Sequence, residues 1–237
     1  MESAPRSEAP LLRFANVSRL YGEGEATVRA LDGVDLTIER GDFVAITGAS
    51  GSGKSTAVSI LGCLDLPTAG QYFIEGHPVQ SLSGDVLAAL RNAKFGFIFQ
   101  SYNLLARTSA LDNVSLPLIY AGVGALEREA RGYAALAAVG LAGREDARPN
   151  QLSGGQQQRV AVARALINAP EVILADEPTG NLDSKTGEEI MQLISSLNEA
   201  RGITVIMVTH DPKSAAWARR RVVFSDGKIA SDTRVSA

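Results

Sequence analysis

One short segment, residues 48–55, constrains the fold of this chain more than any other. An apolar run over residues 43–47 precedes it, and residues 55–64 after it carry apolar side chains at helical spacing. A buried strand, a glycine loop and a helix in this order form a cradle for phosphate. Glycines let successive backbone N–H groups point at one anion, and the helix N-terminus adds the positive end of its dipole. The alternative, a flexible glycine-serine linker, is disfavoured by the flanking strand and helix.

The segment fits the pattern G-x-x-x-x-G-K-[ST], which assigns a task to each of its positions. Lys54 is expected to reach the terminal phosphates of a nucleotide, and the hydroxyl of Ser55 to ligate Mg²⁺. No role is assigned to Thr56. The cradle itself is expected to consist of Gly48, Ser50, Gly51, Ser52 and Gly53.

Length and composition restrict the class of protein. The 237 residues suit one large α/β domain, and a hydrophobic content of 45% suits a packed globule. The net charge of −3 lacks the basic excess expected of a nucleic-acid-binding domain. With Cys63 as its single cysteine the chain can form no internal disulfide, and a reducing, cytoplasmic setting fits. No stretch reaches the roughly 18 apolar residues of a transmembrane helix, so a role at a membrane requires a partner.

Hydrophobic periodicity predicts strands that alternate with helices after an antiparallel start. Residues 1–10 are expected to be a disordered lead, and residues 11–39 to form antiparallel strands with turns at residues 22–24 and at Asp32-Gly33. Further strands are expected over residues 71–75, 95–99, 172–175 and 203–208, with a closing hairpin around Asp226-Gly227. Helices are expected over residues 55–64, 83–92, 111–118, 125–139, 156–168 and 183–199. Because strand signals fade after residue 101, a helical subdomain over about residues 101–168 is expected as an insertion.

Chemistry-bearing residues follow several of these predicted strands. Gly48, Gln100, Asp176 and His210 each fall just after a predicted strand. In a parallel sheet the carboxyl ends of the strands meet at one edge, so these residues are expected to share one site.

Two adjacent acidic residues, Asp176 and Glu177, end one of the apolar strands. Burying both without a cation or a proton would be costly. Asp176 is expected to bind Mg²⁺ opposite Ser55, and Glu177 to orient and polarise an attacking water as general base. An exposed turn whose carboxylate caps the next helix is the alternative.

A second helix start with exposed glycine backbone lies at Leu152-Ser153-Gly154-Gly155-Gln156. Serine is a preferred N-cap, and glycine N–H groups at a helix start can bind an anion. Taken alone, the segment would be an ordinary capped helix.

Together these residues resemble the ATP-binding cassette family, the ATPases of transporters, from about Leu12 to Ile229. The residues 152–156 match the signature motif of that family without change. The resemblance implies an α/β fold: a P-loop NTPase core with a parallel sheet, an antiparallel β subdomain and an inserted α-helical subdomain. It also implies ATP and Mg²⁺ as ligands and a head-to-tail dimer, in which Ser153 and Gly155 of one copy contact the γ-phosphate held by the loop of the other.

Four further positions take roles from the resemblance. Gln100 matches the Q-loop glutamine, near Mg²⁺ and the attacking water, and His210 matches the switch histidine, which hydrogen-bonds the γ-phosphate. Asp183 matches the loop that crosses the dimer centre, and Tyr21 matches the aromatic that stacks on adenine. Their alternatives are a solvated amide, a structural histidine, a helix N-cap and an exposed tyrosine. Ala49 departs from the proline or arginine common in relatives, with little effect expected because that position contributes backbone.

Residues 100–105, 116–122 and 175–183 resemble the macrolide-exporter and lipoprotein-releasing branch of the family. The resemblance implies peripheral attachment to the inner face of the cell membrane. The partner it implies is a permease with few transmembrane helices and a large extracytoplasmic domain, sensed by residues 100–118. A soluble cassette ATPase acting on nucleic acid or the ribosome is the alternative. No coiled coil separates Lys54 from Ser153, which are only 99 positions apart, and no second cassette or basic linker is present. A nucleotide-binding regulator without turnover is disfavoured because both Glu177 and His210 are in place.

Overall fold

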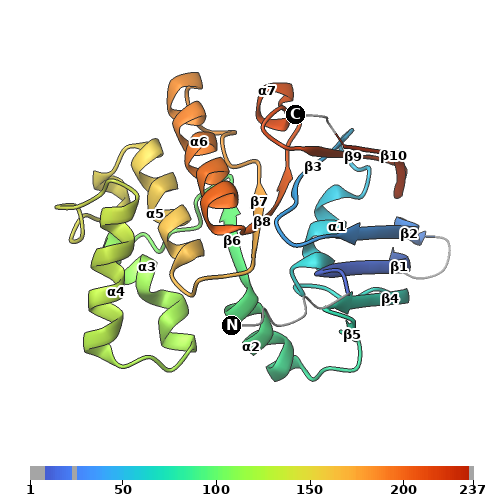
Figure 1. Cartoon of the computed structure of the whole chain (residues 1–237), viewed down its shortest axis with the longest axis horizontal. Helices are drawn as coiled ribbons and strands as arrows, with labels where there is room; N and C mark the ends of the chain where they lie inside the picture. Colours follow the sequence, from blue (N-terminus) through green and yellow to red (C-terminus); the bar gives the residue numbers. More distant parts are fainter. Residues whose placement is uncertain (1–8, 23–25, 235–237) are drawn as a thin grey trace, which may run out of the picture.

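Two β-sheets organise the computed structural model, which describes residues 9–22 and 26–234 (Figure 1). The larger sheet has the order β10-β9-β3-β8-β7-β6, in which every neighbouring pair is parallel except β10 and β9. Its strands are β3 (Phe43–Gly48), β6 (Phe95–Phe99), β7 (Val172–Asp176), β8 (Thr204–Val208), β9 (Arg220–Ser225) and β10 (Lys228–Arg234). The smaller sheet is antiparallel, with the order β2-β1-β4-β5. It contains β1 (Leu12–Tyr21), β2 (Val28–Ile38), β4 (Ala69–Ile74) and β5 (His77–Pro78).

The helices fall on both sides of the larger sheet. They are α1 (Lys54–Leu61), α2 (Gly84–Lys94), α3 (Ala110–Tyr120), α4 (Ala125–Ala138), α5 (Gly154–Leu166), α6 (Ser184–Arg201) and α7 (Pro212–Ala215). α3, α4 and α5 gather on the left in Figure 1, away from the smaller sheet. The chain enters this group after β6 and returns into β7, the strand paired with β6. This connectivity is compatible with an insertion, and the limits of a separate subdomain stay a prediction.

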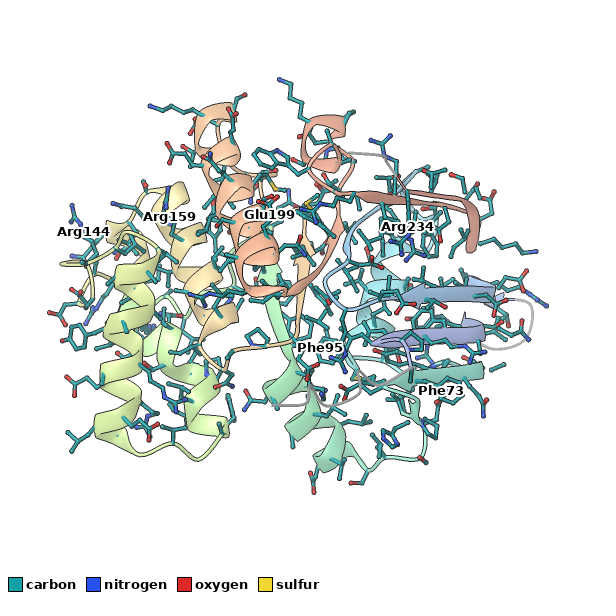
Figure 2. All side chains as sticks on the ribbon, in the orientation of Figure 1. Phe73, Phe95, Arg144, Arg159, Glu199 and Arg234 are labelled. Atoms are coloured by element: carbon teal, nitrogen blue, oxygen red, sulfur yellow. The ribbon has the colours of Figure 1, made fainter. Side chains whose placement is uncertain are left out.

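The alternation of side chains along β3 explains how one sheet supports two cores. Val44 and Ile46 join a hydrophobic cluster with α1 and the smaller sheet, whereas Phe43 and Ala45 join a second cluster with α5 and α6. Figure 2 shows side chains packed on both sides of the central strands. Cys63 belongs to the first cluster, and burial raises the pKa of its thiol to about 11. No helix in the described part of the chain is long and apolar enough to span a membrane.

Two local predictions are wrong. Asp32-Gly33 is no turn, because β2 runs through it; Gly33 has a φ of +68° and its N–H donates to the Ser18 hydroxyl at 2.9 Å. A glycine at positive φ inside paired strands is a bulge, and a bulge carries the same residue signal as a turn. The predicted helix over residues 55–64 ends early at Leu61, because Gly62 is its C-cap and Cys63 turns the backbone out of the helix with a φ of +54°. Leu64 is therefore exposed.

Two predictions fall wholly or partly outside the described residues. These are the lead, of which residues 1–8 are outside, and the turn at residues 22–24, of which residues 23 and 24 are outside.

Candidate functional site

The loop between β3 and α1 has a backbone that requires glycine at two positions. Gly48 has a φ of +141° and Gly53 a φ of +103°. A Cβ atom at Gly48 would lie 2.2 Å from the Phe224 carbonyl oxygen, and one at Gly53 would lie 2.4 Å from the Ala30 carbonyl oxygen. Gly53 is the N-cap of α1 and provides no side-chain cap, so the first N–H groups of the helix keep their capacity to bind an anion.

Lys54 places its ammonium inside this loop. Its Nζ donates to the carbonyl oxygens of Gly48 at 2.9 Å and Ala49 at 2.6 Å. A cation held by carbonyl oxygens next to free helix N–H groups makes this end of α1 strongly favourable for phosphate.

The hairpin of β9 and β10 supports the loop from the side. At its turn, Asp226 and Gly227 both have positive φ, as the Asp-Gly dipeptide predicts. The Gly227 N–H donates to the Ser52 carbonyl oxygen at 3.0 Å, and the Gly227 carbonyl accepts from the Asp32 N–H at 2.9 Å. Sequence reasoning finds the hairpin but not this contact, which depends on β9 lying beside β3.

Strand register brings the other candidate residues to the same edge. Ile46 in β3 is opposite Val208 in β8, Val208 is opposite Asp176 in β7, and Asp176 is opposite Phe99 in β6. The residues that follow these strands therefore lie in one row at their carboxyl ends, as predicted from their positions in the sequence.

Asp176 is half-buried and has a charged environment. Burial raises the pKa of its carboxyl, the neighbouring Glu177 charge raises it further, and Lys54 opposes the shift. A divalent cation would favour the ionised carboxylate, so Asp176 fits a metal ligand. Among the described residues no group of three or more His, Cys, Asp or Glu could hold a metal. A site with few protein carboxylates suits Mg²⁺, which takes one or two carboxylates together with substrate phosphates rather than an all-protein cage.

Glu177 is held by the residues that follow β8. It has a φ of +47°, an uncommon conformation for a non-glycine residue. Its Oε1 accepts from the His210 backbone N–H at 2.9 Å and lies 2.6 Å from His210 Nδ1. Its Oε2 accepts from the Thr209 hydroxyl at 3.2 Å. Sequence reasoning missed Thr209; the available signal is a polar residue between an apolar strand and His210.

Gln100 and Asp183 are both engaged within the chain. Asn181 donates from Nδ2 to the Gln100 carbonyl oxygen at 2.9 Å, and Gln100 Nε2 lies 3.4 Å from Asn181 Oδ1. Asp183 caps α6 by accepting from the N–H groups of Lys185 and Thr186, each at 3.1 Å. The Thr186 hydroxyl and these N–H groups lower the pKa of the Asp183 carboxyl. Asp183 is thus a helix N-cap in the structure, as the alternative interpretation of the sequence predicts.

Tyr21 presents part of its ring to solvent, with 40% of the residue exposed. Its hydroxyl donates to Asp65 Oδ2 at 2.8 Å, and the Arg19 guanidinium lies 4.6 Å from the ring centroid. These two contacts fix the orientation of the ring.

The signature segment begins α5 with a complete capping box. Ser153 Oγ accepts from the Gln156 N–H at 3.3 Å, and Gln156 Oε1 accepts from the Ser153 N–H at 2.9 Å. The Ser153 residue is exposed. In Figure 1, α5 lies left of the central strands and α1 lies to their right. No hydrogen bond joins residues 152–156 to residues 48–55, both of which are described.

A hydrophobic groove with a cavity volume of about 670 Å³ lies between α2, α3, α5 and β6. Its lining combines aromatic and polar side chains, among them Phe97, Phe99, Asn103, Tyr120 and Arg164. Tyr120, at the end of α3, is 80% exposed.

Comparisons with known proteins agree on one family. A family model described as ABC transporter matches residues 31–180. The macrolide export ATP-binding/permease protein MacB of Hyphomonas neptunium is 57% identical over 224 residues, 94% of this chain and 35% of that protein. MacB of Neisseria meningitidis is 54% identical over 223 residues, 94% of this chain and 34% of that protein. The chain thus spans about a third of the length of these curated relatives.

Solved structures give the same result. A dimeric, post-hydrolysis structure of the ATP-binding cassette MJ0796 bound to ADP and Pi is 46% identical with a TM-score of 0.88, covering 95% of this chain and 99% of that one. CbiO1 from Clostridium perfringens, part of the ABC transporter complex cbiONQ, is 29% identical with a TM-score of 0.84, covering 96% of this chain and 89% of that one.

Proposed function

This chain belongs to the ABC transporter family as one of its ATPase cassettes, and we propose that two copies of it close on ATP to drive a membrane permease. One observation carries the proposal. The phosphate loop, Asp176, Glu177 and His210 share one edge of the sheet, while α5, which begins with the signature segment, lies on the other side of the central strands from α1. Each chain then supplies half of two composite sites, which a twofold dimer completes together. The relative MJ0796 forms a dimer bound to ADP and Pi, which supports this arrangement.

The proposed reaction is in-line attack of water on the γ-phosphorus of ATP. The loop N–H groups and Lys54 bind the β- and γ-phosphates, and Glu177 accepts a proton as the water oxygen bonds to phosphorus. The bond between the γ-phosphorus and the β–γ bridging oxygen breaks, leaving ADP and phosphate. Gln100 and His210 orient the water and the γ-phosphate, and Tyr21 stacks on the adenine.

Mg²⁺ fits this site through Ser55 and Asp176. When bound, it neutralises charge on the β- and γ-phosphate oxygens. Burial raises the pKa of the half-buried Asp176 carboxyl, so a bound cation would stabilise its ionised form.

Ser153 and Gly155 are proposed to contact the γ-phosphate from the second copy. The capped start of α5 offers backbone N–H groups and an exposed serine hydroxyl, which suits an anion. Asp183, at the start of α6, is proposed to lie at the centre of the dimer, where its carboxylate stays ionised because its pKa is lowered.

The proposed permease has few transmembrane helices and a large extracytoplasmic domain, as in macrolide export or lipoprotein release. Support comes from the MacB relatives, whose name joins an ATP-binding part to a permease. The groove beside Phe99 and Tyr120 is the proposed docking surface, because it adjoins Gln100 and contains exposed aromatic area. With this docking surface, we propose that the cassette lies on the inner face of the cell membrane. The proposal holds both for a permease on a separate chain and for one continuous with the cassette.

The Glu177→Gln variant tests the chemistry. It keeps the size of the side chain and one of its two acceptor oxygens but cannot accept a proton, so we expect ATP hydrolysis to fall by about 100-fold or more. ATP binding should be retained, and a dimer should accumulate in ATP and Mg²⁺ by size-exclusion chromatography with light scattering. Lys54→Ala is the matched variant that should instead weaken binding of ATP in a titration. Hydrolysis by Glu177→Gln at the parent rate would remove Glu177 from its role.

A further inference from the structure

Thr209 joins three strands at the point where the proposed reaction occurs. It directly follows β8 and is completely buried. Its backbone N–H donates to the Ile46 carbonyl oxygen at 3.2 Å, in the strand that leads into the phosphate loop. Its hydroxyl lies 3.2 Å from Glu177 Oε2, in the segment that follows β7. One residue therefore relates the carboxylate of Glu177 to the strand that carries the phosphate loop.

The direction of the hydroxyl bond is determined by its neighbours. The Asp211 N–H donates to Thr209 Oγ1 at 3.0 Å, so that oxygen acts as acceptor there. A threonine hydroxyl has one proton, and an ionised carboxylate can only accept. The proton of Thr209 is therefore given to Glu177, in a charge-assisted bond.

Further bonds hold Asp211 in place. Its carboxylate accepts from the N–H of Ser214 at 3.0 Å and from the Ser214 hydroxyl at 2.8 Å. The Ser214 hydroxyl also lies 3.0 Å from Thr179 Oγ1, two residues after Glu177. The network thus returns to the segment that contains Glu177, and Thr209 is its buried member in direct contact with the carboxylate.

We propose that Thr209 is a positioning residue for ATP hydrolysis, which holds the Glu177 carboxylate in the orientation needed to accept the proton of the attacking water. The inference rests on the proposed function of Glu177 as general base. His210 donates to Oε1 and Thr209 to Oε2, so the two donors together fix the rotation of the carboxylate plane. A misplaced carboxylate slows the proton transfer but leaves the phosphate loop and its affinity for nucleotide unchanged.

The test compares kcat and KM for ATP in the assembled protein with Mg²⁺. Thr209→Val keeps the shape and removes the hydroxyl, and we expect kcat to fall by about tenfold or more with KM within about twofold of the parent. Thr209→Ser restores the donor and should recover most of kcat. Thr209→Ala is a second deletion of the hydroxyl, should the valine variant fold poorly.

Thr204→Val is the matched control. Thr204 begins the same strand, is buried, and accepts from the Gly41 N–H at 2.9 Å with its hydroxyl, far from Glu177. Thr204→Val and Thr209→Val remove buried hydroxyls at opposite ends of β8, so a general structural effect would lower kcat in both. A parent-like kcat in Thr209→Val or Thr209→Ala, an equal loss in Thr204→Val, or no recovery with Thr209→Ser would overturn the inference.

A double variant separates this inference from the proposed function. If Thr209 acts through Glu177, adding Thr209→Val to Glu177→Gln should change the single-turnover rate by less than about twofold, since coupled effects are not additive. Multiplied losses would contradict the inference while leaving Glu177 as the base. A Glu177→Gln variant that hydrolyses ATP at the parent rate would instead refute the proposed function itself.

Discussion

Asp176 and Glu177 are adjacent in the sequence and occupy different environments. Asp176 ends β7 half-buried, with its pKa raised chiefly by burial and then by the charge of Glu177. Glu177 leaves the strand with a φ of +47° and directs its carboxylate to the residues after β8. These environments support the proposed roles of Asp176 as a ligand for a cation and of Glu177 as the general base, because neighbouring residues rather than residue type distinguish the two carboxylates.

The environment of Asp176 predicts a conflict between stability and activity. Its raised pKa means that the ionised carboxylate is less stable in the folded chain than in the unfolded chain. Asp176→Asn should therefore be at least as stable as the parent in urea unfolding with EDTA, while hydrolysis in Mg²⁺ falls by about 100-fold or more. An asparagine variant that is clearly less stable, or that hydrolyses ATP normally, would contradict this account of Asp176.

At the scale of elements, α3 and α5 begin in the same way and provide an internal comparison. Ser109 and Asp112 form a capping box at α3, as Ser153 and Gln156 do at α5. Each serine stabilises the first turn of its helix by satisfying a backbone N–H group. Of these two helix starts, only that of α5 is proposed to contact a phosphate.

Alanine at each cap separates the two contributions. Ser109→Ala and Ser153→Ala should each lower the free energy of unfolding by about 1 kcal/mol, measured with urea. Ser153→Ala alone should also lower the rate of ATP hydrolysis, by about tenfold or more, because it removes a donor to the γ-phosphate. Equal ATPase rates in the two variants would reduce Ser153 to a helix cap.

The elements also show how far the sequence predicts the fold and the site. Local periodicity predicts most strands and helices. The positions just after the apolar strands predict which side chains lie at the carboxyl edge of the larger sheet. Asp32-Gly33 was predicted wrongly because turns and bulges use the same residues. The contact of Thr209 with Glu177 and that of Gly227 with Ser52 could not be predicted, since both depend on which strands are neighbours in the sheet. Strand order is a property of the whole chain.

At the scale of the whole molecule, Arg220 connects the two sheets. It is buried and donates to the Thr37 carbonyl oxygen in β2 at 2.7 Å. It also pairs with Asp42, before β3, and makes two bonds to Asp232 in β10. The pKa of Asp232 is lowered, chiefly by these bonds to Arg220. One guanidinium thus connects the hairpin that supports the phosphate loop to the smaller sheet and to the residue before β3.

The lowered pKa of Asp232 predicts the pH dependence of its contribution. A carboxylate whose pKa is lower in the folded state stabilises that state above its ordinary pKa of about 4, and the stabilisation is lost as the pH falls through the lower value. Asp232→Asn should cost about 1 kcal/mol at pH 7, since the pair is partly exposed, and the difference from the parent should shrink below about pH 4. Asp226→Asn makes the same change on the same hairpin, where the carboxylate accepts from Ser225 instead of an arginine, and serves as control in urea unfolding. A difference that is constant with pH would argue against the pair.

The dimer with shared sites is the central claim, and two inactive variants test it directly when mixed. Lys54→Ala removes the phosphate contact of one chain and Ser153→Arg blocks the signature of the other, so each pure variant has no intact site. A mixed dimer contains one composite site with both residues intact, and random mixing should restore up to about a quarter of the parent ATPase rate, because about half of the dimers are mixed and each has one of two sites. A mixture that stays as inactive as its two components would contradict the account.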